Sequence, residues 1–247
     1  MFARVARQAV IPVSHIEWRQ LLSRLTGLLL SFTLLSMVGM AIMKLNDPQL
    51  LPIQKVRAQG SFINLTEQML LKRAGDIRGG YFSINVTAVQ KNIESLAWVD
   101  KAYVRRLWPD TLMITVTEQT ASAWWQDDGL INQRGELFFP EKNSFPANLP
   151  KLNGPAGTHR QLLEHYQNMN SMLEKSALTI QRIDMDARRS LVIMLVGGVK
   201  ILLGRDEYYP RLERFVRMHA KLLAAEMNNI QKIDMRYTNG FTLLRQQ

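Results

Sequence analysis

The sequence predicts an α+β protein that is anchored in a membrane by one N-terminal helix. Three observations lead to this class. An uncharged run at 25–43 lies between Arg24 and Lys44. From Ile53 onward, helical and strand periodicities alternate in short segments. The 247 residues include no cysteine, which fits an exported domain held together by its apolar core, although it is also common in cytosolic chains.

The uncharged run has the length of a membrane-spanning helix. At about 1.5 Å per residue it extends roughly 28 Å, close to a hydrocarbon core of about 30 Å. A buried core helix is a poor alternative, because no flanking sequence supplies a domain to bury it before Pro48 and Pro52. A cleaved signal peptide has a shorter apolar region and a small-x-small cleavage site, whereas this run ends Met-Ala-Ile-Met-Lys. We therefore predict an uncleaved transmembrane helix at 25–43.

The segments on either side of this helix set its orientation only weakly. Residues 1–24 form a short head that carries four arginines, and 44–52 form a linker marked by two prolines. Lysines and arginines close to the helix are nearly equal in number on its two sides. A short arginine-bearing head before a first span favours a cytoplasmic N-terminus, so we expect the C-terminal part to be exported.

The chain is basic, with a formal net charge of +10. Such a balance suits nucleic acid, but an exported domain does not meet it. Anionic lipid or an acidic protein partner is the better match.

A first module of helices and strands is expected at 53–118. A short strand around Val56 ends at Gly60, and the spacing of Asn64 and Glu67 predicts a capped helix over 65–74. Asn85 is a cap for a second helix. Strands follow at 99–107 and 111–118, joined by Trp-Pro-Asp, and in the second strand apolar and more polar residues alternate.

A second module is expected at 119–247. It begins with strands and tight turns to 139, in which one of the adjacent Trp124 and Trp125 faces the core. A proline-rich loop at 140–157 shows no periodic pattern, and a helix begins near Thr158. Strands are predicted at 180–185 and 190–203, the latter folded at a Gly-Gly turn, and a helix at 207–226 with Arg211, Arg214, Arg217 and Lys221 on its polar face.

The end of the chain predicts a terminal strand at 232–237, a turn at Asn239-Gly240 and a further apolar stretch at 241–244. Terminal strands often form sheet edges, whose unpaired main-chain groups can bind another chain. We therefore expect a free edge along the backbone of 233–237.

Catalytic and metal-binding signatures are absent from the sequence. It has no G-x-S-x-G, H-E-x-x-H or G-x-x-x-x-G-K motif, and its four histidines do not show ligand spacing. We expect a protein that is not an enzyme, with no cofactor, no metal and no small-molecule substrate.

One resemblance becomes specific at the first module. The strand–helix–helix–strand–strand order and the run W-V-x-x-A-x-V-R-R-x-W-P-D-x-L-x-I-x-V-x-E at 98–118 resemble a POTRA domain. Its place after a lone N-terminal helix is similar to the FtsQ/DivIB family of bacterial cell division proteins. The likeness continues through Ala-Trp at 123–124, the segment 129–138 and Leu-Gly-Arg at 203–205. It implies a POTRA domain of β-α-α-β-β order, followed by a mixed β domain with flanking helices.

The resemblance also implies a function. The chain is expected to be an inner-membrane scaffold of the division septum, with a periplasmic C-terminal part, that joins the partners FtsB and FtsL. FtsB would add a strand to the last strand of the β domain, and the POTRA domain would bind other division proteins around 104–108. By position, the expected partner-binding residues are Arg189, Arg236, Tyr237, Asn239 and Gly240. Tyr237 would be an aromatic anchor and Arg236 would bind an acidic partner residue, whereas an aromatic that the family has downstream is Arg245 here.

Two alternatives remain at this point. Tyr237 is also compatible with a core position, and POTRA domains also occur in transport or secretion assemblies with outer-membrane barrels. A barrel needs many amphipathic strands of about ten residues, which the roughly 130 residues after the first module do not provide.

Overall fold

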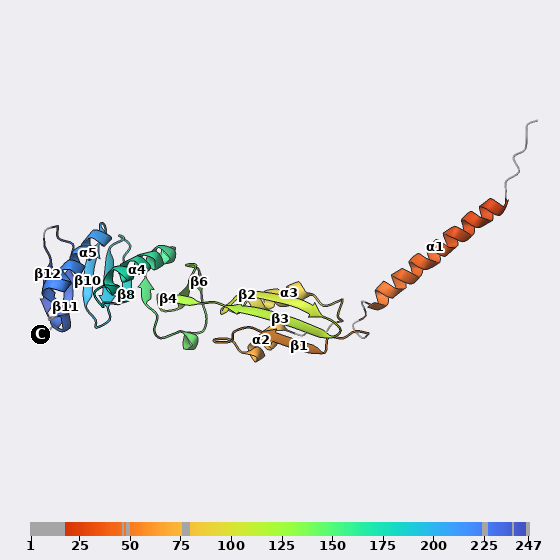
Figure 1. Ribbon diagram of the computed structural model, residues 1–247, viewed down its shortest axis with the longest axis horizontal. Coiled ribbons are helices and arrows are strands. Elements are labelled where there is room, and N and C mark those ends of the chain that lie inside the picture. The colour runs from red at the N-terminus through yellow and green to blue at the C-terminus, as the bar shows by residue number, and fades with distance from the viewer. Residues whose placement is uncertain are drawn as a thin grey trace, which may run out of the picture. The chain divides into compact units, whose positions relative to one another are not determined.

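The structure is a computed structural model that describes residues 18–45, 47, 50–75, 80–223, 227–238 and 240–245 (Figure 1). Most of the predicted N-terminal head and part of the predicted linker lie outside these ranges. The described residues form an N-terminal helix, a small three-stranded sheet with two helices, and a nine-stranded sheet with further helices. The α+β class predicted from the sequence is therefore confirmed.

The N-terminal helix α1, Trp18–Leu45, is longer than the predicted span 25–43. Its stretch Leu22–Leu45 is, among the described residues, the one helix long and apolar enough to cross a membrane. Its apolar side chains are exposed rather than packed against protein, which a helix in lipid requires. The helix therefore fits a single-pass membrane protein.

The three-stranded sheet has the order β1-β3-β2 and carries two helices. Its elements are β1 (Lys55–Gln59), α2 (Glu67–Ala74), α3 (Val86–Glu94), β2 (Val99–Leu107) and β3 (Thr111–Glu118). Asn85 caps α3 as predicted, because its side chain accepts a hydrogen bond from the Ala88 amide at 3.0 Å. Gly60 permits β1 to end close to β3, since a Cβ there would lie 2.6 Å from the Val116 carbonyl oxygen.

The predicted cap of α2 was wrong. Thr66, not Asn64, is the N-cap, and its hydroxyl accepts from the Met69 amide at 3.2 Å. Asn64 is instead bound to the carboxylate of Glu118. That carboxylate also accepts the amides of Ile63 at 2.9 Å and Leu65 at 3.2 Å, so the end of β3 fixes the turn that leads into α2.

We predict that Glu118→Gln lowers the free energy of unfolding of this module by about 1–3 kcal/mol, because an amide oxygen accepts these three backbone bonds less strongly than a carboxylate. Hydrogen exchange at the amides of 63–65 should accelerate together with the loss measured by urea unfolding. The control is Asp127→Asn in an exposed turn, which should change neither quantity. Unchanged exchange at 63–65 in the Glu118 variant would contradict the assignment.

The nine-stranded sheet has the order β12-β11-β10-β9-β8-β7-β4-β5-β6. Its strands are β4 (Ala121–Trp125), β5 (Gly129–Asn132), β6 (Leu137–Phe138), β7 (Lys151–Asn153), β8 (Ile180–Met185), β9 (Leu191–Leu195), β10 (Lys200–Gly204), β11 (Ile230–Asp234) and β12 (Thr242–Arg245). The predicted Gly-Gly turn joins β9 to β10, and Gly197 and Gly198 both have positive φ. The pairing is mixed: β4–β7, β7–β8 and β10–β11 are parallel.

Strand β7 contradicts the prediction that 140–157 is a loop throughout. That segment also holds a short 3-10 helix, η1 (Lys142–Ser144). In β7, Leu152 is fully buried, and the strand joins β4 to β8, so it connects the two halves of the sheet. Three residues are too few to show a strand periodicity, which explains why the sequence did not predict it.

Helices α4 (His159–Glu174) and α5 (Tyr208–Met218) contact each other and pack on this sheet, α4 on β7 and β8 and α5 on β10 (Figure 1). Leu162, Leu173, Leu212 and Phe215 enter the core from the helices. Trp125 is buried in the same core. Trp124 is only partly buried, and its indole N–H donates to the Pro146 carbonyl oxygen at 2.8 Å.

The last helical segments differ from the prediction of one helix at 207–226. α5 ends at Met218 and continues as a π-helical turn, η2 (His219–Leu223), while 224–226 lie outside the described residues. A short 3-10 helix, η3 (Met227–Asn229), leads into β11. Thr158 is the N-cap residue of α4 but makes no side-chain capping bond, because its hydroxyl donates to the Pro155 carbonyl oxygen at 2.7 Å.

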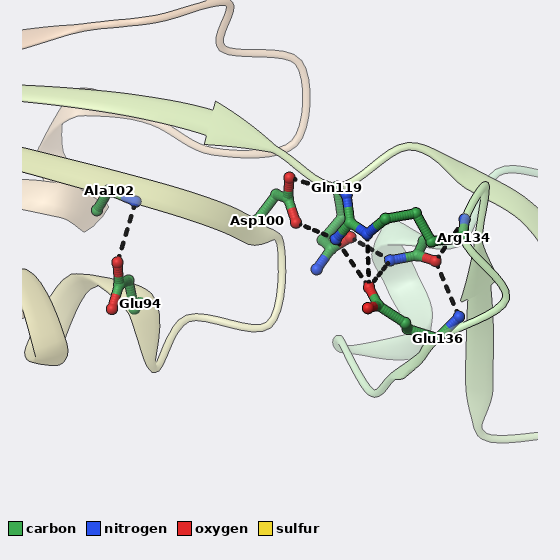
Figure 2. Close-up of polar contacts among 7 residues, drawn as sticks. Glu94, Asp100, Ala102, Gln119, Arg134 and Glu136 are labelled. Atoms are coloured by element: carbon green, nitrogen blue, oxygen red, sulfur yellow. Dashed lines mark hydrogen bonds and ion pairs between the residues drawn. The ribbon is translucent and has the colours of Figure 1, made fainter.

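A polar cluster ties strand β2 to the β5–β6 turn. Figure 2 shows Asp100, Arg134 and Glu136 turned toward one another. The Arg134 guanidinium donates to the Asp100 carboxylate and, through Nε, to Glu136 at 2.9 Å. These hydrogen bonds, to Asp100 first, raise the pKa of Arg134, and the bond from Arg134 lowers the pKa of Glu136. Asn132 adds a bond to Gln119 at 3.0 Å, so the cluster fixes β5 beside the end of β3.

Candidate partner-docking edge

Strand β12 is one end of the nine-stranded sheet, with β11 as its neighbour. It pairs antiparallel with β11, Thr242 opposite Asp234 and Leu244 opposite Lys232. Within the described residues no strand lies on its other side. Its outer row of main-chain N–H and C=O groups is therefore available to a further strand.

The expectation of a free edge along 233–237 was wrong. β11 ends at Asp234 and is flanked on both sides, by β10 in parallel and by β12 in antiparallel pairing. Beyond it, the Met235 amide donates to the Leu202 carbonyl oxygen, and 237–238 form a bend rather than a strand. The open edge thus belongs to the stretch after Gly240, which the sequence predicted only as a further apolar segment.

The side chains of β12 alternate in the way that an edge strand on a core requires. Leu243 is half-buried and packs against the core of the sheet, as does Phe241 just before the strand. Leu244 points away from that core and is 48% exposed. An added strand would cover an apolar side chain as well as pair with the main chain.

The bend that precedes β12 is held by Arg214 of α5. Its Nη2 donates to the carbonyl oxygens of Met235 and Tyr237, both at 2.7 Å, and its Nη1 donates to that of Thr238 at 2.6 Å. Three carbonyl groups that face no strand are satisfied by one guanidinium. The sequence placed Arg214 on a polar helix face and gave no sign of this role, because the contact joins α5 to a bend that follows it by more than twenty residues.

Arg236 is paired within the chain. Its Nη2 and Nε contact the buried Asp234 carboxylate at 2.6 Å and 2.9 Å. These hydrogen bonds hold the pKa of the Asp234 carboxyl below its usual range, although burial acts in the opposite direction. The Arg236 side chain is more than half exposed, and its guanidinium therefore meets a partner as half of an ion pair rather than as an isolated cation.

The Asp234–Arg236 pair predicts a pH dependence. Since folding lowers the pKa of Asp234, the pair stabilises the fold above the unfolded-state pKa of about 3.9, and the contribution is lost as pH falls through the folded-state pKa. At pH 7, Asp234→Asn should reduce the free energy of unfolding by about 1–3 kcal/mol. Urea unfolding should show this difference shrinking below pH 4. A difference that stays constant down to pH 3 would contradict the role of the carboxylate.

The other predicted partner-binding residues are placed as follows. Tyr237 is 55% exposed, so the alternative of a core position does not hold. Gly240 has open space where a Cβ would point, and Asn239 lies outside the described residues. Tyr237 and Gly240 thus both lie just before the start of β12.

Arg189 lies in the turn between β8 and β9. It is exposed, has a positive φ of 65°, and donates to the Gln161 side chain at 3.1 Å, while its carbonyl oxygen accepts from the Tyr208 hydroxyl at 2.9 Å. Leu191 at the start of β9 pairs with Gly204 at the end of β10. On the other side of β10, Leu202 pairs with Asp234 at the end of β11. Arg189 is therefore at the same end of the sheet as Arg236, two strands removed from β11.

The described residues contain no group of three or more His, Asp or Glu side chains that could hold a metal ion. The candidate site is thus a main-chain edge with an exposed leucine, an exposed tyrosine and two arginines at its end.

Comparisons with known proteins cover both modules. A family model described as "POTRA domain, FtsQ-type" matches residues 51–119, and one described as "Cell division protein FtsQ/DivIB, C-terminal" matches 123–236. The second match ends before β12. The cell division protein FtsQ of Coxiella burnetii is 33% identical over 204 residues, which are 82% of this chain and 84% of the relative. The FtsQ proteins of Xanthomonas campestris pv. campestris and Allochromatium vinosum are also 33% identical, over 78% and 80% of this chain and 70% and 79% of their own lengths.

Proposed function

The chain belongs to the FtsQ/DivIB family of cell division proteins, and from this premise we propose that it is a membrane-anchored divisome scaffold that accepts a partner strand at β12. The single observation that supports the docking mode is the position of β12 at the end of its sheet with one paired side. Main-chain hydrogen bonds would supply affinity, and side-chain contacts on alternate residues would supply specificity.

The partner implied by the resemblance is FtsB, with FtsL in the same complex. An extended FtsB segment that pairs with β12 would cover Leu244 and reach Tyr237 at the bend before the strand. Arg236 and Arg189 at this end of the sheet favour a partner segment that carries acidic residues there. Gly240 has open space where a Cβ would point, which leaves room for the incoming main chain beside the bend.

The topology follows from the anchor. We infer that 1–24 is a cytoplasmic head, that 25–43 spans the inner membrane and that 44–52 is a linker. The POTRA domain 53–118 and the β domain 119–247 then face the periplasm at the septum. Other division proteins would bind through the POTRA domain. A scaffold of this kind has no substrate, and its function is to assemble its partners.

The docking proposal predicts that Tyr237→Asp weakens capture of FtsB by the full-length chain. Loss of an exposed aromatic anchor and a new like charge beside an acidic segment should cost about 2 kcal/mol or more, roughly a thirtyfold change in Kd. Capture is measured with detergent-solubilised protein and purified FtsB. The control is Tyr103→Asp, which changes a similarly exposed tyrosine on β2. Undiminished capture by the folded Tyr237 variant would count against docking at this edge.

A further inference from the structure

One end of the three-stranded sheet presents large apolar side chains to solvent. They come from three segments: the chain that enters β1, the turn before α3, and the end of β2 with the turn that follows it. We call them the proximal rim: Leu50, Phe82, Leu107 and Trp108. Trp108 is 75% exposed and Leu50 is 56% exposed. The core of the module does not need these side chains, so their exposure calls for another explanation.

The three segments of the rim are bound to one another. The Tyr81 amide donates to the Leu51 carbonyl oxygen at 2.7 Å, and Pro52 forms a bridge with Gly80. The Gln54 amide donates to the Asp110 carbonyl oxygen at 2.9 Å. The start of β1 and the β2–β3 turn therefore lie together at one end of the sheet (Figure 1).

Arg106 completes this framework. Its Nη2 donates to the Ile84 carbonyl oxygen at 2.7 Å, which attaches the turn before α3 to the end of β2. Lys55 contacts the Asp110 carboxylate at 3.6 Å and keeps most of its side chain in solvent. The rim is thus a fixed surface of aromatic and aliphatic groups with cations at its border, not a set of independent loop tips.

The chain length places this surface near the membrane. Helix α1 ends at Leu45, and the first contact with the rim framework is at Leu51, six residues later. Six residues span at most about 20–22 Å whatever their conformation. Lys44 is the first charge after the uncharged run, so it marks the edge of the hydrocarbon core. The interfacial region beyond this edge is itself about 5–8 Å thick, so the rim is within reach of it.

We propose that the proximal rim docks on the lipid–water interface of the membrane that α1 crosses. Trp108 and Phe82 are its interfacial anchors, since aromatic side chains are enriched at this level of a bilayer. Leu50 and Leu107 add apolar area, and Lys55 and Arg106 lie where phosphate groups are found. Docking fixes this end of the module against the bilayer. The inference rests on the membrane anchor of the proposed function, but not on docking at β12.

The test uses the full-length chain in bilayer nanodiscs whose lipids are brominated just below the headgroup. The fluorescence of Trp108 is obtained by subtracting the emission of the Trp108→Phe variant from that of the native chain. The proposal predicts that brominated lipid quenches this difference signal. The double change Leu50→Ser and Phe82→Ser should abolish the quenching, because it removes the neighbouring anchors. The matched control Tyr103→Ser, an exposed aromatic of the same module outside the rim, should leave it intact.

Trp18 in α1 distinguishes failure of rim docking from failure of the membrane anchor. It is exposed at the start of the helix and is isolated in the same manner with Trp18→Phe. Quenching of Trp18 without quenching of Trp108 would overturn the proposal while leaving the anchor in place. Absence of both signals would instead refute the membrane anchor. Shielding of Trp108 only after a division protein is added would assign the rim to a protein partner and would also overturn the proposal.

Discussion

Deletion of 241–247, which removes β12, is expected to abolish capture of FtsB while the rest of the nine-stranded sheet stays folded. The strand is the outermost of its sheet, and only Leu243 and Phe241 pack on the core. Losing these partly buried groups should cost at most about 3–5 kcal/mol of the free energy of unfolding. Losing β12 should remove binding, because the deletion takes away the docking strand together with Leu244, the exposed side chain that an added strand would cover.

Circular dichroism and urea unfolding of the truncated chain distinguish lost docking from lost folding. The control is Phe139→Ser, which alters an exposed apolar residue next to β6 at the opposite end of the sheet. This variant should capture FtsB normally. Normal capture by a folded chain that lacks β12 would show that the partner binds elsewhere.

Deletion of 24–43 has the second large expected effect. It removes the uncharged run of α1 and should convert the chain from an integral membrane protein to one that fractionates with soluble protein. No other described helix is long and apolar enough to replace the span. Carbonate extraction followed by flotation measures the change.

A control for this deletion keeps the length of the helix but changes its composition. Replacing Leu29, Leu30, Leu34 and Leu35 by serine should also release the protein, because each exposed leucine is in the run that faces lipid. Replacing the same residues by isoleucine should not. A chain that resists carbonate extraction after deletion of 24–43 would contradict the anchor.

The sequence predicts the regular elements of the first module well. Strands at 99–107 and 111–118 and the Asn85 cap follow from local signals, and the structure has the same bounds. The prediction that Asn64 caps α2 was wrong because the Asn64 side chain is hydrogen-bonded to the carboxylate of Glu118, which is distant in sequence. The spacing of neighbouring residues cannot indicate that a residue so distant in sequence binds the predicted cap.

The candidate site was less predictable than the fold. Residues near the docking edge were identified from position, but the choice of β12 over β11 depends on which strand pairs with β10. The parallel β10–β11 pairing spans the whole of α5, so no short-range pattern encodes it. The roles of Arg214 and of the pair formed by Asp234 and Arg236 likewise depend on tertiary contacts.

The most direct test is hydrogen exchange at the amides of 242–245 in the full-length chain, with and without FtsB. The account predicts that outward-facing β12 amides gain protection on binding, on alternate residues, while those of β6 at the other edge do not change. Unaltered exchange along β12 in a saturated complex would contradict strand addition at this edge.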